Sequence, residues 1–260
     1  MEDFFIGVDI GSLTAKVVLV DAQGKALGWA VARSGYSGRD VAQRLTREIL
    51  AEKGVKEEQI KATVATGYGR VTYPAEREVS EITCQAKGSA HFFPGARTVI
   101  DIGGQDSKVI KVLPGGKVID FAMNDKCAAG TGRFLEVMAG ALEVSLEEVG
   151  ALALKAEEHK SISSFCTVFA ESEVISHASA GALKPDILAG VCESVAARVS
   201  ALVERVGLES EVVFTGGVAK NVGVTKALSE QIGYPLLIPE NPQITAALGA
   251  ALLAWGMGKN

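Results

Sequence analysis

Two copies of one stretch decide the fold: VDIGSLTAKVVLV at residues 8–20 and IDIGGQDSKVIKV at residues 100–112. A DIG tripeptide could occur twice by chance, but the lysine, the β-branched run and the glycine turn that follow it also recur. The matched positions, each 92 residues apart, are Asp9 and Asp101, Gly11 and Gly103, Lys16 and Lys108, and Gly24 and Gly116. We conclude that the chain carries an internal duplication.

Each copy is typical of a β-meander that is followed by helices. In the first copy, three strand-like runs, FFIGVDIG, TAKVVLVD and ALGWAVAR, are joined by a glycine turn and an AQGK hairpin turn. Apolar residues at helical spacing follow each meander. The helices predicted in this way are Arg39–Lys53, Gly130–Leu142, Ser145–Ala156, Pro185–Val206, Val222–Gln231 and Thr245–Trp255.

Strands followed by helices, twice over, predict an α/β protein with two lobes. We place an N-terminal lobe at residues 1–95 and a C-terminal lobe at residues 96–242. The last segment, 243–260, is expected to pack back on the first lobe. No Pro/Ser-rich linker separates the lobes, so we expect them to share a cleft.

Composition narrows the possible partners. The chain has 260 residues, of which 48% are apolar, enough for a sizeable core, and its net charge is −5. This acidic balance argues against nucleic acid or an anionic membrane as a partner. The first residues, MEDFFIGVDIG, are not typical of a signal peptide, and no apolar run is long enough for a membrane span. We therefore expect a cytoplasmic protein.

The repeated stretch has the chemistry of a phosphate-binding loop. A strand that ends in Asp-x-Gly and turns directly into another strand aims several backbone N–H groups one way, and glycine permits close approach of a phosphate. The first loop offers Ser12, Leu13, Thr14, Ala15 and Lys16, and the second offers Gly103, Gly104, Gln105 and Asp106. Asp9 and Asp101, at the strand ends, would suit a hydrated Mg²⁺. The pattern is neither a Walker P-loop nor a Rossmann fingerprint.

Two further segments support a nucleotide site. VVFTGGVAKN, residues 212–221, is an apolar strand that runs through two glycines into a helix start. Such a turn lets a base or ribose lie on the backbone, and the helix N-terminus favours anions. The residues proposed to contact the nucleotide here are Gly216, Gly217, Val218 and Asn221. Gln243 follows a later strand and is expected near the same site.

The four cysteines are widely spaced, and a cytosolic protein has little use for disulfides. Cys127, in NDKCAAGTGRF, and Cys166, in SSFCTVF, precede predicted helices. A helix N-terminus favours the thiolate that a metal ligand needs, but isolated cysteines are more often packing residues. Cys84 and Cys192 are interpreted as buried packing residues. Because an iron–sulfur cluster usually takes four cysteines, two ligands per chain would require a two-fold dimer.

The motifs resemble a known superfamily. DIGSLTAKV, DIGGQDSKV and FTGGVAKN are similar to the phosphate loops and adenosine motif of the duplicated actin-like ATPase fold, shared by acetate kinase, sugar kinases, heat-shock chaperones and actin. MNDKCAAGTGRFLE and FCTVFAESEVISH are similar to segments of the 2-hydroxyacyl-CoA dehydratase activators and of the related benzoyl-CoA reductase ATPase subunits. The resemblance covers essentially the whole chain.

This resemblance implies an ATPase that activates a dehydratase by one-electron transfer. It implies ATP or ADP with Mg²⁺, and one 4Fe-4S cluster per homodimer, held by Cys127 and Cys166 of both subunits. The implied partners are a 2-hydroxyacyl-CoA dehydratase, with 2-hydroxyglutaryl-CoA as the expected substrate, and ferredoxin or flavodoxin as reductant. Helices that start near the two cysteines would couple ATP hydrolysis to the cluster.

Some alternatives remain open at this point. Gln105 and Asp106 are the candidates for orienting the attacking water or Mg²⁺, although Gln105 could equally contact only a phosphate. A small-molecule kinase of the same fold would need a catalytic carboxylate over an acceptor pocket, and none stands out. An ATP-regulated binding protein resembling a chaperone ATPase would lack its peptide-binding domain. Neither alternative gives Cys127 and Cys166 a purpose.

Overall fold

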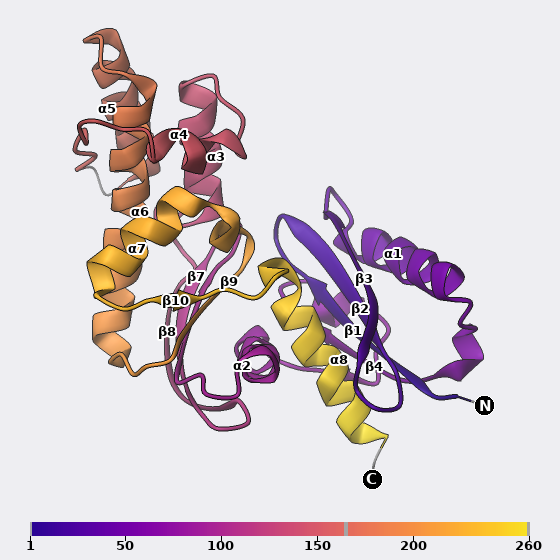
Figure 1. Cartoon of the computed structure of the whole chain (residues 1–260). Coiled ribbons are helices and arrows are strands. Elements are labelled where there is room, and N and C mark those ends of the chain that lie inside the picture. The colour runs from indigo at the N-terminus through magenta and orange to yellow at the C-terminus, as the bar shows by residue number, and fades with distance from the viewer. Residues whose placement is uncertain (1, 164–165, 259–260) are drawn as a thin grey trace. The chain divides into compact units, whose positions relative to one another are not determined.

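The computed structural model describes residues 2–163 and 166–258 (Figure 1). Ser164 and Phe165, in the segment predicted around Cys166, lie outside the described residues, as do the last two residues of the predicted segment 243–260. The chain divides into two compact units. Unit 1 is Met1–Val99, Val112–Ile119 and Pro239–Asn260, and unit 2 is Ile100–Lys111 and Asp120–Ile238.

The order of elements repeats along the chain. The strands are β1 Phe4–Ile10, β2 Thr14–Val20, β3 Ala26–Arg33, β4 Ile60–Thr66, β5 Arg77–Glu78, β6 Thr98–Ile102, β7 Ser107–Leu113, β8 Lys117–Asn124, β9 Val212–Thr215 and β10 Leu236–Leu237. The α-helices are α1 Gly38–Lys53, α2 Glu81–Phe92, α3 Gly132–Ala141, α4 Glu148–Ala153, α5 Thr167–Ser179, α6 Lys184–Val206, α7 Val222–Ile232 and α8 Thr245–Met257. The six predicted helices are confirmed as α1, α3, α4, α6, α7 and α8, with boundaries that differ by a few residues.

The two sheets have the same strand order, which confirms the duplication. The first runs β3-β2-β1-β4-β5 and the second runs β8-β7-β6-β9-β10. In the first, β1 and β2 are antiparallel and β1 and β4 are parallel, with α1 in the crossover. The hairpin glycines also match, because Gly24 and Gly116 have φ of 78° and 81°.

The first sheet buries both of its faces, as alternation along a strand requires. Phe4, Ile6 and Val8 of β1 pack in one cluster with α1, whereas Phe5 packs in a second cluster with α8. Figure 1 shows α1 and α8 on opposite sides of this sheet. The final helix α8 thus belongs to the layer that covers β1, β2 and β4.

Helix α2 was not predicted, and its packing explains why. Gly88 lies where an added Cβ would come within 2.1 Å of the Thr245 carbonyl oxygen, and at Gly249 it would come within 1.8 Å of the Cys84 carbonyl oxygen. The two helices α2 and α8 therefore touch backbone to backbone. The buried face of α2 consists of small and polar residues, so it shows no large apolar stripe.

The second unit has one core cluster, built from its sheet and helices, with Phe134, Ile187 and Phe214 among its buried side chains. Helices α4 and α7 both pack on α6, the longest helix described. Among the described residues, no helix is long and apolar enough to cross a membrane.

The α2–α8 contact predicts a difference between two glycines of one helix. Gly249→Ala should lower the free energy of unfolding by about 3 kcal/mol or more, because its methyl group would collide with backbone. Gly256→Ala is the matched control, since no neighbouring atom lies within 4 Å of its Cβ position. It should be neutral or stabilise by about 0.5–1 kcal/mol through helix propensity. Urea unfolding measures both, and equal effects would contradict this packing.

Candidate functional site

The first loop, residues 9–16, is held by a charge pair across its hairpin. Asp9, near the end of β1, faces Lys16 on β2 in register, and Lys16 Nζ lies 2.8 Å from Asp9 Oδ2. The N–H of Gly11 donates to the Thr14 carbonyl at 3.0 Å, and Ser34 Oγ donates to the Gly11 carbonyl at 2.9 Å. The loop is therefore a closed turn with a lysine amine at its base.

The predicted phosphate contacts of this loop lie at its surface. Ser12, Leu13 and Thr14 are half-buried, Lys16 is 13% exposed and Ala15 is buried. The carboxylate of Asp9 is 2% exposed, and its Oδ1 has no hydrogen-bond partner among the described residues. A buried, unsatisfied carboxylate oxygen is the kind of group that a hydrated Mg²⁺ ion would satisfy. Asp9 therefore fits the predicted metal role.

The second loop, residues 101–108, repeats the turn and adds a second carboxylate. The N–H of Gly103 donates to the Asp106 carbonyl at 2.9 Å, which is the counterpart of the first loop's bond. Lys108 Nζ lies 2.8 Å from Asp106 Oδ1 and 3.5 Å from Asp101 Oδ2, and all three side chains are nearly fully buried. Gln105 is exposed. Of the two predicted catalytic residues, Gln105 thus faces solvent and Asp106 is held by Lys108.

The start of α3 is bonded directly to this second loop. The N–H of Gly132 donates to the Gly103 carbonyl at 2.9 Å, and that of Arg133 donates to the Gly104 carbonyl at 2.8 Å. Any Cβ on Gly132 would approach the Gly103 oxygen to 3.1 Å. A shift of the loop backbone would therefore reach α3 through two hydrogen bonds.

Cys127 lies before this helix, as predicted, but the helix begins two residues later than predicted. Helix α3 begins at Gly132, and Cys127 stands in a turn that Asn124 holds. Asn124 Nδ2 donates to the Cys127 carbonyl at 2.8 Å, and the Cys127 N–H donates to Asn124 Oδ1 at 3.2 Å. The correction has a local cause: Gly130, with φ of 84°, breaks the helical backbone before α3 begins.

Cys166 is exposed and is itself the N-cap residue of α5, with no side-chain cap bond. Ser163 donates its N–H and hydroxyl to the Glu173 carboxylate, each at 2.8 Å. His177 Nε2 lies 3.1 Å from the Ser161 carbonyl oxygen. The chain that leads to Cys166 is thus anchored to α5 by two side chains that our sequence analysis did not identify.

The turn after β9 packs against the second loop's strand. Thr215 Oγ1 donates to Asp101 Oδ1 at 3.1 Å, a contact that the sequence analysis missed. Gly216 has φ of 87°, and a Cβ there would lie 2.3 Å from the Ile102 carbonyl oxygen. The Thr-Gly pair at the end of an apolar strand is the sequence pattern that could have predicted both the Thr215–Asp101 bond and the close approach at Gly216.

The remaining predicted nucleotide contacts occupy two different units. Gly217 and Val218 begin a 3-10 turn, Gly217–Lys220, in unit 2. Asn221 caps α7, because its Oδ1 accepts from the Val224 N–H at 3.0 Å. Gln243 lies in the turn Pro242–Ile244 that leads into α8 in unit 1. Nucleotide contact by these residues remains a prediction.

The other two cysteines are buried, as predicted. Cys84 and Cys192 are 0% and 1% exposed. Burial raises the pKa of the Cys84 thiol to about 12, and burial also raises the pKa of the Cys192 thiol to about 12. Neither thiol is suited to ligation or nucleophilic chemistry near neutral pH. Among the described residues, Cys127 and Cys166 are the cysteines with access to solvent, and neither forms a disulfide.

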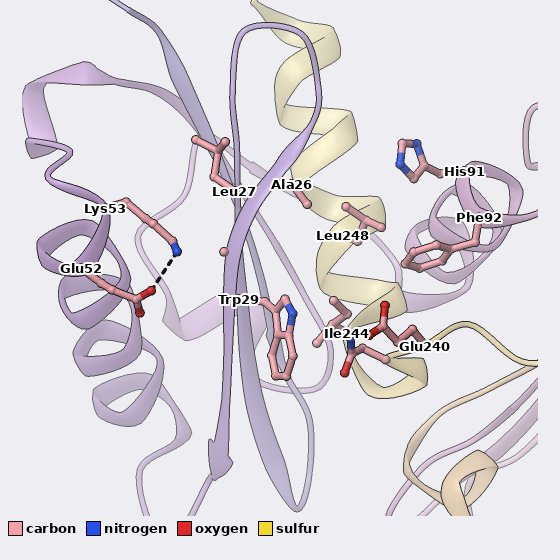
Figure 2. Close-up of a pocket in the computed structure, with 12 residues that line it drawn as sticks. Ala26, Leu27, Trp29, Glu52, Lys53, His91, Phe92, Glu240, Ile244 and Leu248 are labelled. Carbon is pink, nitrogen blue, oxygen red and sulfur yellow. Dashed lines mark hydrogen bonds and ion pairs between the residues drawn. The ribbon is translucent and has the colours of Figure 1, made fainter.

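A pocket of about 460 Å³ in unit 1 is separate from all of these residues. Figure 2 shows Trp29 of β3 beside Ile244, Leu248 and Phe92, with the ion pair of Lys53 and Glu52 on the other side of the strand. None of the predicted site residues lines this pocket. It has no glycine turn or buried charge, so it is not a candidate phosphate site.

Comparison with known proteins is consistent with this geometry. The profile of the BadF/BadG/BcrA/BcrD ATPase family matches residues 6–254. The activator of lactoyl-CoA dehydratase from Anaerotignum propionicum is 48% identical over 97% of each chain.

Two solved structures resemble the whole chain. The 2-hydroxyisocaproyl-CoA dehydratase activator from Clostridium difficile, solved with bound ADPNP, has a TM-score of 0.94 at 45% identity and covers 100% of this chain, which covers 96% of that one. Component A of the Acidaminococcus fermentans (R)-2-hydroxyglutaryl-CoA dehydratase has a TM-score of 0.95 at 43% identity, with coverage of 99% and 100%. These likenesses confirm the predicted fold and the family resemblance.

Thiol labelling tests the four cysteine environments. In metal-free, reduced protein at pH 8, Ellman's reagent should react quickly with two thiols, Cys127 and Cys166. The other two should react only after unfolding, because burial and a raised pKa leave almost no accessible thiolate. Mass spectrometry of alkylated peptides identifies the sites. Rapid labelling of Cys84 or Cys192 in folded protein would contradict their burial.

Proposed function

Because the chain belongs to the BadF/BadG/BcrA/BcrD ATPase family, we propose that it is the ATP-dependent activator of a 2-hydroxyacyl-CoA dehydratase. Its relatives carry the names of activators for three different 2-hydroxyacyl-CoA dehydratases. The observation that carries the proposal is local: two accessible cysteines that form no disulfide stand in the same unit as the second loop, and Cys127 lies in the turn before the helix that is bonded to this loop.

The nucleotide part of the proposal rests on the two loops. In each, a backbone turn presents N–H groups that can bind phosphate oxygens, and the first loop adds the amine of Lys16. Asp9 and Asp101 would hold Mg²⁺ through water, and the ion would neutralise phosphate charge. Gln105, which is exposed at the tip of the second loop, would orient the attacking water. Asp106 then has an indirect part, since its carboxylate fixes Lys108.

The metal part of the proposal rests on the donor set. Thiolates are the usual ligands of iron–sulfur clusters, which take four. One chain offers Cys127 and Cys166, so two chains around a two-fold axis would offer the full set. A 4Fe-4S cluster held in this way would supply one-electron transfer to the dehydratase, with ferredoxin or flavodoxin as the electron donor.

An exposed apolar face next to Cys166 supports the homodimer. Val168 and Phe169, in the first turn of α5, are 65% and 66% exposed, and Ile175 lies seven residues after Val168 at 49%. Side chains seven apart share one helix face. Exposed apolar groups of this size usually mark an interaction surface. Because they flank a ligand that one chain cannot complete, we assign them to a second copy of the chain.

The coupling between nucleotide and thiols follows the chain of hydrogen bonds. Binding or release of a phosphate at Gly103 and Gly104 would shift the backbone of the second loop. This shift would move the N-terminus of α3, because the N–H groups of Gly132 and Arg133 are bonded to the loop carbonyls. The turn that holds Cys127 precedes this helix and would move with it. The second loop and the ligand turn are thus two ends of one short mechanical path.

Anaerobic purification tests the metal assignment. The protein should be brown and contain about four irons per dimer. Cys127→Ser and Cys166→Ser should each lose the colour and the iron, and they should no longer activate a purified 2-hydroxyacyl-CoA dehydratase with ATP and reductant. Cys84→Ser and Cys192→Ser are the controls and should keep the iron. Iron-free wild-type protein prepared without oxygen would refute the proposal.

The apolar face predicts the oligomeric state. Phe169→Glu should shift the protein from dimer to monomer in sedimentation or light scattering, because a charge would be buried in the interface. Tyr234→Glu is the control, since Tyr234 is also an exposed aromatic residue of unit 2 but lies outside α5. It should remain dimeric. A monomeric wild type, or a dimeric Phe169→Glu variant, would argue against this interface.

A further inference from the structure

The duplication extends beyond the two loops to the turns after the central parallel strands. Strand β4 ends at Thr66, which Gly67 follows, and β9 ends at Thr215, which Gly216 follows. Both glycines have positive φ, 83° and 87°. The two Thr-Gly pairs are therefore structural counterparts.

Each glycine also faces the same pair of atoms in its own unit. A Cβ on Gly67 would lie 2.4 Å from Asp9 Oδ1 and 2.5 Å from the Ile10 carbonyl oxygen. A Cβ on Gly216 would lie 2.8 Å from Asp101 Oδ1 and 2.3 Å from the Ile102 carbonyl oxygen. The loop aspartate thus points its Oδ1 at the Thr-Gly turn in both units.

The two threonines nevertheless differ in their bonding. Thr215 Oγ1 donates to Asp101 Oδ1 at 3.1 Å. Thr66 is the register partner of Asp9 on the adjacent parallel strand, so their side chains share one face of the sheet. Yet Asp9 Oδ1 is buried without a hydrogen-bond partner among the described residues. The Thr66 hydroxyl is also buried, and it interacts with the Cys84 thiol instead of with the carboxylate. A buried carboxylate oxygen without a donor thus lies on the same sheet face as a hydroxyl whose partner is a thiol, which is a weak acceptor.

The lysines explain the difference. Lys108 is 2.8 Å from Asp106 and 3.5 Å from Asp101, so Asp106 draws the amine away from the strand-end aspartate. The first loop has Thr14 at the equivalent position, and Lys16 sits on Asp9 at 2.8 Å. The carboxylate of Asp9 therefore depends on an amine that the phosphate loop needs for its ligand.

We propose that Thr66 is a positioning residue for Asp9 that acts when nucleotide binds. This inference rests on the proposed role of residues 9–16 as a phosphate loop. Once the Lys16 amine turns to a phosphate oxygen, Asp9 loses a partner, and the Thr66 hydroxyl donates to its Oδ1 as Thr215 does to Asp101. The carboxylate is then held in place toward the hydrated Mg²⁺ ion.

The surroundings leave Thr66 few other tasks. Its side chain lies on the same sheet face as Val64, which packs in one cluster with α8 and the buried Cys84. The Thr66 hydroxyl lowers the pKa of the Cys84 thiol, while burial raises it more strongly. A neutral thiol is only a weak hydrogen-bond acceptor. The carboxylate of Asp9 is the stronger acceptor on this face.

The matched substitutions are Thr66→Val and Thr215→Val, which remove a hydroxyl and keep the shape. Two quantities are measured on the purified protein alone: the Tm without nucleotide, and the Kd for MgADP by calorimetry. Thr215→Val should lower the Tm, because its hydroxyl is already bonded. Thr66→Val should lower the Tm much less or leave it unchanged, because its hydroxyl interacts only with the weakly accepting Cys84 thiol. It should weaken MgADP binding about tenfold or more, as expected for a lost bond to a charged group.

Thr66→Ser should restore binding, since it keeps the donor. The inference is overturned if Thr66→Val lowers the Tm as much as Thr215→Val, which would make Thr66 merely structural, or if MgADP binding is unchanged. Binding by the wild type is the internal reference. A wild type that fails to bind MgADP would refute the nucleotide site itself, whereas loss of dehydratase activation alone would not affect this test.

Discussion

The pairing of a strand-end aspartate with a lysine on the next strand is the constraint on which the rest of the structure depends. Asp9 with Lys16, and Asp101 with Lys108, place opposite charges at the base of two glycine turns. Removing either partner would leave a charge with little access to water, which is costly. The pair therefore fixes the hairpin register, and the register sets which backbone groups form each loop. The central parallel strands end beside the same aspartates.

The two loops share one plan and differ in their bonding. In the second unit Lys108 is bonded to Asp106, and Thr215 donates a hydrogen bond to Asp101 Oδ1. In the first unit Lys16 is bonded directly to Asp9. Asp101 Oδ1 in the second loop thus has a hydrogen-bond donor, whereas Asp9 Oδ1 in the first loop has none among the described residues. Among the described residues, the second unit has helices α3 to α6 between β8 and β9, where the first unit has the α-helix α1 between β3 and β4, and both accessible cysteines lie between β8 and α6.

Much of this could be predicted because the signals are local. The repeat offset, the glycine turns and the helical spacing of α1, α6 and α8 need only neighbouring residues to be interpreted. Helix α2 was not predicted because Gly88 and its small neighbours pack closely against α8, a helix more than 150 residues later in the chain. This packing leaves α2 without the large apolar residues that mark a helix in the sequence. The start of α3 was placed too early because a positive φ at Gly130 cannot be inferred from an apolar pattern.

By itself, the sequence determined that the chain is a duplicated ATPase with two phosphate loops and two candidate ligand cysteines, because spacing and residue type carry that information. Only the tertiary structure decided that α3 is bonded to the second loop, that Asp9 Oδ1 has no hydrogen-bond donor among the described residues, and that Asp101 Oδ1 accepts a bond from Thr215. The physical reason is that burial and hydrogen-bond satisfaction depend on strands and helices far apart in the chain. The two DIG stretches look alike in sequence, and their bonding to other elements sets them apart.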